Sequence, residues 1–196
     1  MAKKGLDFIV AGVGGQGTVV ASDILSEVGA QWGYDVKKSD ILGLAVRGGS
    51  VLSHVRWAEK VHAPVVEERG ADFLVGFEWL ETLRRISYIR PEGTVVVNAC
   101  RLDPIAVSSG EAAYPPTDEI CGLLKRASST VHVIPGLQTA LDLGNARVLN
   151  IVVMGALSKL LEVEETLWHD CIRKRVPEKV LELNLEAFRR GRALIP

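Results

Sequence analysis

Residues 9–25 read IVAGVGGQGTVVASDIL, an apolar run that passes through a turn with four glycines into a helical pattern. The glycines Gly12, Gly14 and Gly17 have the GxGxxG spacing, which joins a first strand to a first helix in nucleotide-binding α/β folds. The helix start behind such a turn offers unpaired N–H groups and a partial positive charge, which suit a phosphate. The candidate ligand-binding residues of this turn are Gly12, Gly14, Gly15, Gln16 and Gly17.

Strand and helix patterns alternate along the first two thirds of the chain. Strands are predicted at residues 6–11, 34–38, 51–57, 71–77, 94–98 and 130–135, and helices at residues 18–32, 78–88 and 117–127. After Gly136 the pattern is helical to the end. The sequence therefore predicts one α/β domain over residues 1–196: a three-layer fold with a mainly parallel sheet, a Rossmann-like first βαβ unit and a helical C-terminal third.

Five local expectations follow from the same sequence patterns. Residues 39–50 contain three glycines without a lasting period and predict a loop. Residues 51–57 alternate, with Val51, Ser53, Val55 and Trp57 opposite Leu52, His54 and Arg56, which predicts a strand with one wetter face. The tripeptide PEG at residues 91–93 predicts a turn, and Thr117 is expected to cap the helix that follows it. The apolar residues 145–162 predict a core helix or part of a subunit interface.

Composition and charge limit the partners of the chain. The 196 residues are 47% hydrophobic and carry a net charge of -1, so no basic field favours nucleic acid. The start has only a five-residue apolar run before the glycines, too short for a signal-peptide core or a membrane span. We expect a cytoplasmic protein with no membrane and no nucleic-acid partner.

The sequence offers no evident metal ligands and no evident catalytic group. Cys100, Cys121 and Cys171 lie far apart without a CxxC pair, so no iron–sulfur cluster or structural zinc is expected from this chain. We expect three ordinary buried thiols. The four histidines are scattered without acids or cysteines at ligand spacing, and the catalytic residues stay unknown.

A free-standing, nicotinamide-dependent oxidoreductase is the alternative that the glycine turn raises. It requires an acid at the end of the second strand, about 20 residues after the glycines. Asp35 stands at the start of that predicted strand and Asp40 lies slightly late, and a loop rather than a crossover helix follows. This hypothesis therefore ranks second, and a purely structural turn also stays open.

Five ordered motifs carry a more specific resemblance. They are GVGGQG at residues 12–17, SDILGLAVRGGSVLSHVRW at 39–57, ADFLVGFEWLETLR at 71–84, VVVN at 95–98 and NIVVMGALSKLL at 150–161. Together they closely resemble the gamma-type subunit of 2-oxoacid:ferredoxin oxidoreductases, and in layout and length the small (beta) subunits of the indolepyruvate branch. The resemblance covers nearly the whole chain. Leu42 and Val46 stand where the family usually has histidine and glutamine, whereas Arg47, Gly48 and Gly49 match.

The resemblance implies oxidative decarboxylation of an aryl 2-oxoacid to its acyl-coenzyme A, with electrons passed to ferredoxin. It also implies that thiamine diphosphate and the iron–sulfur clusters belong to a large partner subunit, while coenzyme A is a co-substrate. The chain agrees with this division, since it has no GDG…NN diphosphate motif and no clustered cysteines. We therefore expect an incomplete enzyme that exposes an apolar surface to its partner and that can form a homodimer in isolation.

Arg47, Gly48 and Gly49 complete the candidate binding site. A guanidinium beside two glycines can grip a phosphate or a carboxylate, although a solvated surface arginine is the simpler alternative. Loops after the first and second strands of an open α/β sheet open on the same edge. The sequence therefore predicts one anion-accepting surface that combines residues 12–17 with residues 47–49.

Overall fold

The computed structural model describes residues 5–43, 45 and 47–196, and its strands and helices alternate as the sequence predicts. The strands are β1 Leu6–Val13, β2 Asp35–Leu42, β3 Ser50–Ala58, β4 Ala71–Gly76, β5 Ile89–Asn98 and β6 Thr130–Ile134. The α-helices are α1 Thr18–Gln31, α2 Trp79–Arg84, α3 Ile105–Ser108, α4 Thr117–Ala127, α5 Gly136–Asp142, α6 Leu149–Lys159, α7 Glu165–Arg175 and α8 Leu181–Arg192. Three short 3-10 turns, Ile86–Tyr88, Ala146–Val148 and Glu178–Val180, lead into β5, α6 and α8.

The six strands form one sheet in the order β2-β3-β1-β4-β5-β6. The pairs β1–β4, β4–β5 and β5–β6 are parallel, whereas β3 runs antiparallel to both β1 and β2. The sheet is therefore mostly parallel, as predicted. The strands β1 and β2 point the same way, but β3 lies between them, so the first βαβ unit spans an inserted strand.

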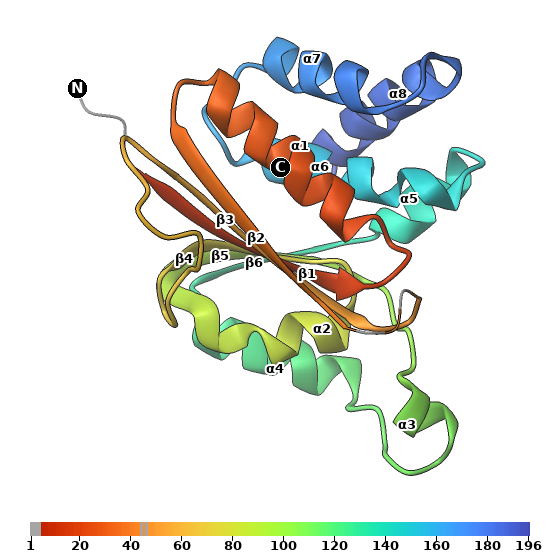
Figure 1. The fold of residues 1–196 in the computed structure, drawn as a ribbon. Coiled ribbons are helices and arrows are strands. Elements are labelled where there is room, and N and C mark those ends of the chain that lie inside the picture. The colour runs from red at the N-terminus through yellow and green to blue at the C-terminus, as the bar shows by residue number, and fades with distance from the viewer. Residues whose placement is uncertain (1–4, 44, 46) are drawn as a thin grey trace.

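Helices cover both faces of the sheet and give the three layers (Figure 1). One face carries α1, α5, α6, α7 and α8, and the other carries α2 and α4, while α3 stands away from the body (Figure 1). Each face has its own apolar cluster, with Val10, Trp57 and Val75 in the first and Ile9, Leu52 and Leu74 in the second. The alternation of side chains along each strand separates these two cores.

Two expectations for residues 39–57 need correction. β2 continues to Leu42 because its residues Ser39 to Leu42 pair with β3, so the first four residues of the predicted loop belong to a strand. The expected wetter face of β3 is not found, since residues 51–55 are buried on both faces, with Leu52 2% and His54 0% exposed. Residues distant in sequence cover this face: the Val66 N–H donates to His54 Nδ1, and the Tyr88 ring meets the imidazole edge to face.

Two smaller expectations are also corrected. The PEG tripeptide lies inside β5, where the register with β4 shifts between Ala71 and Phe73, so it forms an irregularity rather than a turn before the strand. The helix α4 is preceded by Pro116 as its N-cap residue, and no side chain caps it. Thr117 is the first helical residue instead.

The apolar segment after residue 145 is a core helix. All residues of α6 from Leu149 to Ser158 are buried, because α1, α5 and α8 enclose the helix against the sheet. Of the two roles predicted for this segment, a core helix or part of a subunit interface, the structure shows the core helix. Within the part of the chain that the structure describes, no helix combines the length and the apolar character needed to cross a membrane.

Candidate functional site

The glycine turn and the Arg47 loop are joined at the carboxyl edge of the sheet. The Gly14 N–H donates to the Gly49 carbonyl over 2.8 Å, and the Gly48 N–H donates back to the Gly14 carbonyl over 3.1 Å. β1 and β2 both end at this edge, and β3 begins there opposite Val13. The structure therefore brings the two predicted segments together, through reciprocal backbone hydrogen bonds between positions 34 or more residues apart.

Glycine is required at the positions of this surface for different structural reasons. A Cβ at Gly12 would lie 2.6 Å from Thr18 Oγ1 and 2.8 Å from Phe77 Cβ, so close packing requires this glycine. Gly15 has φ 107° and Gly48 φ 78°, and a Cβ at either would meet nothing within 4 Å. Gly15 and Gly48 thus combine a left-handed backbone with open space, which leaves room for a ligand at the surface.

Gln16 works within the protein rather than toward solvent. Its Oε1 accepts the Val13 N–H at 2.8 Å, and its Nε2 donates to the Phe77 carbonyl at 3.0 Å. The same carbonyl accepts Nδ2 of the fully buried Asn98, whose Oδ1 accepts the Leu137 N–H at the start of α5. These two amides tie the ends of β1, β4, β5 and β6 together and position the glycine turn.

Arg47 is exposed, and among the described residues its side chain has no hydrogen bond and no ion pair. It is therefore available to an anion that reaches the joined loops. Of the two positions that depart from the family pattern, Leu42 ends β2 and is 58% exposed. Val46 lies outside the described residues.

A pocket of about 390 Å³ lies between the glycine turn, the start of α1 and the ends of β2 and β3. Its walls are mainly apolar, with Val13, Val19, Val20, Leu42 and Val51 beside glycines 14, 15, 17 and 43. Thr18, the first residue of α1, also lines the pocket, and its buried Oγ1 has no hydrogen-bond partner within the described part of the chain. The volume and the few polar groups are typical of a small-molecule site.

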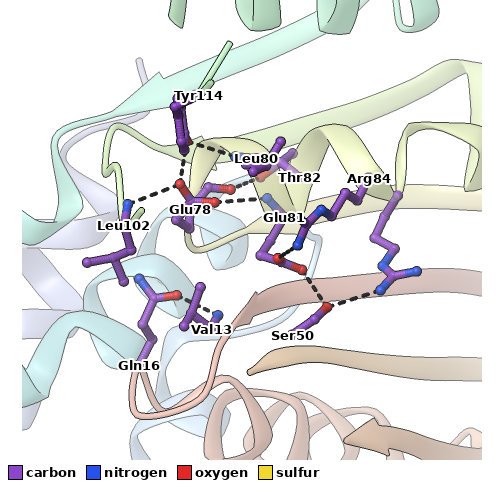
Figure 2. Close-up of polar contacts among 11 residues, drawn as sticks. Val13, Gln16, Ser50, Glu78, Leu80, Glu81, Thr82, Arg84, Leu102 and Tyr114 are labelled. Carbon is purple, nitrogen blue, oxygen red and sulfur yellow. Dashed lines mark hydrogen bonds and ion pairs between the residues drawn. The ribbon is translucent and has the colours of Figure 1, made fainter. Parts of the chain in front are cut away.

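A buried carboxylate that the sequence reading missed organises the neighbouring part of this edge (Figure 2). Glu78 lies between β4 and α2, two residues after Gly76, and is 1% exposed. Its Oε2 accepts the Glu81 N–H at 2.9 Å and so caps α2, while its Oε1 accepts the Leu102 N–H at 3.2 Å and the Tyr114 hydroxyl. The sequence signal that could have identified Glu78 is an acidic residue at the end of the apolar run ADFLVGF, residues 71–77.

A second polar group connects the Arg47 loop to α2 (Figure 2). The Ser50 hydroxyl, at the first residue of β3, donates to Glu81 and accepts from Arg85 at 3.1 Å. Glu81 is 3% exposed and also pairs with Arg84. The loop that carries Arg47 is therefore anchored on one side by the glycine turn and on the other by α2.

The described residues of this edge include neither an activated nucleophile nor a group of metal ligands. Burial, together with the nearby Glu78, raises the pKa of the Cys100 thiol and that of the Tyr114 hydroxyl, so both stay neutral near pH 7. Among residues 5–43, 45 and 47–196, no group of three or more His, Cys, Asp and Glu side chains is placed to hold a metal. The described geometry fits binding and positioning.

The acids that a nicotinamide site requires are engaged elsewhere. Asp35, at the start of β2, accepts the Val61 N–H and the Lys37 ammonium, and these bonds lower its pKa to about 2. Asp40 accepts the Ser53 hydroxyl at 2.5 Å and pairs with Lys38 at 3.0 Å. Neither carboxylate is free to hold a ribose at the glycine turn.

Comparison with known proteins identifies one family and its relatives. Residues 7–194 match the family described as pyruvate ferredoxin/flavodoxin oxidoreductase. The chain is 34% identical over 191 residues to indolepyruvate oxidoreductase subunit IorB of Thermococcus kodakarensis, covering 96% of this chain and 95% of that relative.

Solved structures agree with the fold. The 2-oxoglutarate:ferredoxin oxidoreductase of Magnetococcus marinus, solved with 2-oxoglutarate, coenzyme A and succinyl-CoA bound, has TM-score 0.78 and 26% identity. The match covers 98% of this chain but only 31% of that longer chain. The gamma subunit of a keto/oxoacid ferredoxin oxidoreductase from Geobacter sulfurreducens has TM-score 0.69 at 22% identity, with 96% of this chain and 97% of that chain covered.

Proposed function

The chain belongs to the pyruvate ferredoxin/flavodoxin oxidoreductase family, and from that premise we propose that it is the small subunit of a thiamine-diphosphate-dependent indolepyruvate or other aryl-pyruvate oxidoreductase. The complex would decarboxylate the 2-oxoacid oxidatively to its acyl-coenzyme A and reduce ferredoxin, in the cytoplasm. The observation that carries this proposal is the match to subunit IorB over nearly the full length of both chains.

We propose a division of labour in which a large subunit holds thiamine diphosphate and the iron–sulfur clusters. When bound there, thiamine diphosphate supplies the carbanion chemistry of decarboxylation. The small subunit lacks a diphosphate motif and clustered cysteines, and its contribution is to bind and orient. Its activity would therefore depend on the complex.

The joined surface of residues 12–17 and 47–49 would accept an anionic group. The N–H groups of Gly14 and Gly48 already bond within the protein, so the acceptor would be the first turn of α1 together with the Arg47 guanidinium. Coenzyme A, bound in the Magnetococcus structure, combines phosphates with a long, weakly polar arm. The apolar pocket beside the glycine turn suits such an arm, and a phosphate of thiamine diphosphate on the partner is the second source of the anion.

The proposal is tested by reconstituting the small subunit with the large subunit encoded with it. Arg47→Ala is compared with Arg190→Ala, which removes an exposed arginine of α8 far along the chain. We expect Arg47→Ala to raise the KM for coenzyme A about tenfold or more, the effect of one lost charge-assisted contact, and Arg190→Ala to leave it unchanged. A raised requirement for thiamine diphosphate instead would assign the contact to that cofactor.

Two results would count against the proposal at different levels. If Arg47→Ala leaves both requirements at the wild-type value, the surface is structural but the subunit assignment stands. If no complex of this chain oxidises any aryl 2-oxoacid in the presence of ferredoxin, the proposed function itself is wrong.

A further inference from the structure

An arm projects from the carboxyl edge between β5 and α4. It comprises residues 99–116, includes α3, and stands clear of the sheet and its covering helices (Figure 1). Ile105 in α3 is 85% exposed and Leu102 is 41% exposed. The arm therefore offers large apolar side chains to solvent at a distance from the body.

The arm is held in place at its base rather than attached loosely. Glu78 accepts hydrogen bonds from Leu102 near the start of the arm and from Tyr114 near its end (Figure 2). The Trp79 N–H donates to the Cys100 carbonyl at 3.0 Å, and the Arg101 guanidinium lies 4.4 Å from the centre of the Tyr114 ring. A buried carboxylate thus fixes both ends, so a partner would meet a preorganised surface with little ordering cost.

The exposed large apolar side chains are concentrated on this arm and the adjoining edge. Of the eight described, five are Val20 at the start of α1, Ile41 and Leu42 at the end of β2, and Leu102 and Ile105 on the arm. Val133 lies one residue before the end of β6, farther along the same edge, whereas Val65 lies in the connection between β3 and β4 and Leu141 lies in α5. Scattered apolar residues are ordinary on a protein surface, but a concentration around one edge is typical of an interface.

We propose that these five residues, which we call the docking surface, seat this chain on the large thiamine-bearing subunit. The inference rests on the proposed function and identifies the face that it uses. Val20 and Leu42 also line the pocket beside the glycine turn, so the candidate ligand site opens within the docking surface. A ligand that is held there and reacts at a centre on another chain must face that chain, and the other chain must then cover this edge.

A second copy of this chain fits the docking surface less well. Two-fold packing through this edge would bring two exposed, unpaired Arg47 side chains toward each other and would block both pockets. In the Magnetococcus structure, the match covers only 31% of a longer polypeptide, so a similar fold there is continuous with further protein chain. A larger partner chain is therefore the occupant that the structure favours.

The test compares two double variants of the full-length chain in their binding to the purified large subunit. Ile41→Asp with Ile105→Asp changes the docking surface at two positions outside the pocket lining, with side chains 54% and 85% exposed. Val65→Asp with Leu141→Asp is the matched control, since both residues are 51% exposed elsewhere. We expect the dissociation constant to rise about 100-fold or more for the docking variant, as for interface anchors, and less than threefold for the control.

Each alternative outcome is distinct, provided that both variants keep the melting temperature of the parent. Parental affinity and turnover in the docking variant would overturn the inference and leave the proposed function standing. Equal weakening in both variants would also overturn it. If the docking variant loses self-association but still binds the large subunit, the surface belongs to a second copy. If the parent chain does not bind the large subunit, the inference and the proposed function both fail.

Discussion

The two faces of the sheet are stabilised in different ways. On the α1/α6 face the core is apolar, and α8 approaches α6 so closely that Gly155 and Gly191 each lie against the backbone of the other helix. On the α2/α4 face lie the buried carboxylates and the buried imidazole of the described residues, namely His54, Asp72, Glu78 and Glu81. Packing dominates the first face, and hydrogen bonds to buried charges shape the second.

This difference indicates which face stabilises the fold and which face positions the candidate site. Close packing is non-directional and tolerates no added volume, so the α1/α6 face secures the fold. Charged hydrogen bonds are directional and set distances, so the α2/α4 face positions the Arg47 loop through Glu81 and the arm through Glu78. Four variants test this contrast, from the largest expected effect to the smallest.

The largest effect is expected from Gly191→Ala. A Cβ at Gly191 would lie 2.0 Å from the Val152 carbonyl oxygen, so the two helices must move apart. Overpacking against backbone should lower the free energy of unfolding by about 3 kcal/mol or more, measured by chemical denaturation.

Gly122→Ala is the matched control, on the opposite face. Gly122 lies in α4, where the nearest atom to an added Cβ is Arg126 at 3.7 Å. Alanine should stabilise this helix by about 0.5–1 kcal/mol. If both glycine variants lose similar stability, the proposed contrast in packing between the two faces is wrong.

The second effect concerns the buried charge on the α2/α4 face. Glu78→Ala leaves the Leu102 N–H, the Glu81 N–H and the Tyr114 hydroxyl without their acceptor. We expect a loss of about 2–3 kcal/mol in the free energy of unfolding, because hydrogen bonds to an ionised group are strong. Glu119→Ala, at an exposed position of α4, should change stability by less than about 0.5 kcal/mol. Unchanged stability in Glu78→Ala would show that the charge does not organise this face.

The third effect is a pH dependence that belongs to the same face. Burial, and secondarily the Arg85 charge, lower the pKa of His54, so the folded protein resists a proton that the unfolded chain accepts near pH 6.5. The free energy of unfolding should therefore fall as the pH drops below about 6.5, by at most about 1.4 kcal/mol per pH unit. His54→Asn should flatten this slope in denaturation curves between pH 5 and 7, whereas His62→Asn, at an exposed position, should keep it. An identical slope in the parent and His54→Asn would contradict the assignment.

The smallest effect on stability is expected for Arg47→Ala. The side chain is exposed and makes no hydrogen bond within the described residues, so the free energy of unfolding should change by less than about 0.5 kcal/mol. The same variant should weaken the complex's use of an anionic ligand, as argued above. A large loss of stability would mean that Arg47 supports the loop rather than the ligand.

Local sequence was sufficient for the elements with strong patterns. The strand–glycine turn–helix at the start of the chain, the helix at 117–127, the helical region after Gly136 and the mostly parallel sheet were predicted from periodicity and turn residues. The family was predicted from five ordered motifs and is confirmed by the match over residues 7–194. The expected meeting of the two loops is also observed, since Gly14 forms backbone hydrogen bonds with Gly48 and Gly49, whereas their binding role stays a prediction.

The errors of the sequence-based predictions share a cause: segments distant in the sequence pair with these residues or bury them. Residues 39–42 look like a loop until β3 pairs with them, and the strand at 51–57 looks half exposed until segments such as those of Val66 and Tyr88 cover His54. The binding role assigned to Gln16 stays a prediction. The structure adds an internal role, because the side-chain amide accepts a hydrogen bond from the Val13 N–H and donates one to the Phe77 carbonyl.

By itself the sequence determined the type of the elements with strong patterns, the glycine turn and the family, because periodicity, glycine and ordered motifs are properties of short stretches. Only the tertiary structure decided that β3 separates β1 from β2, that Glu78 holds the arm, and that the exposed apolar residues gather at the carboxyl edge. These features join positions tens of residues apart, and the energy that selects them comes from pairing and burial when the whole chain is folded.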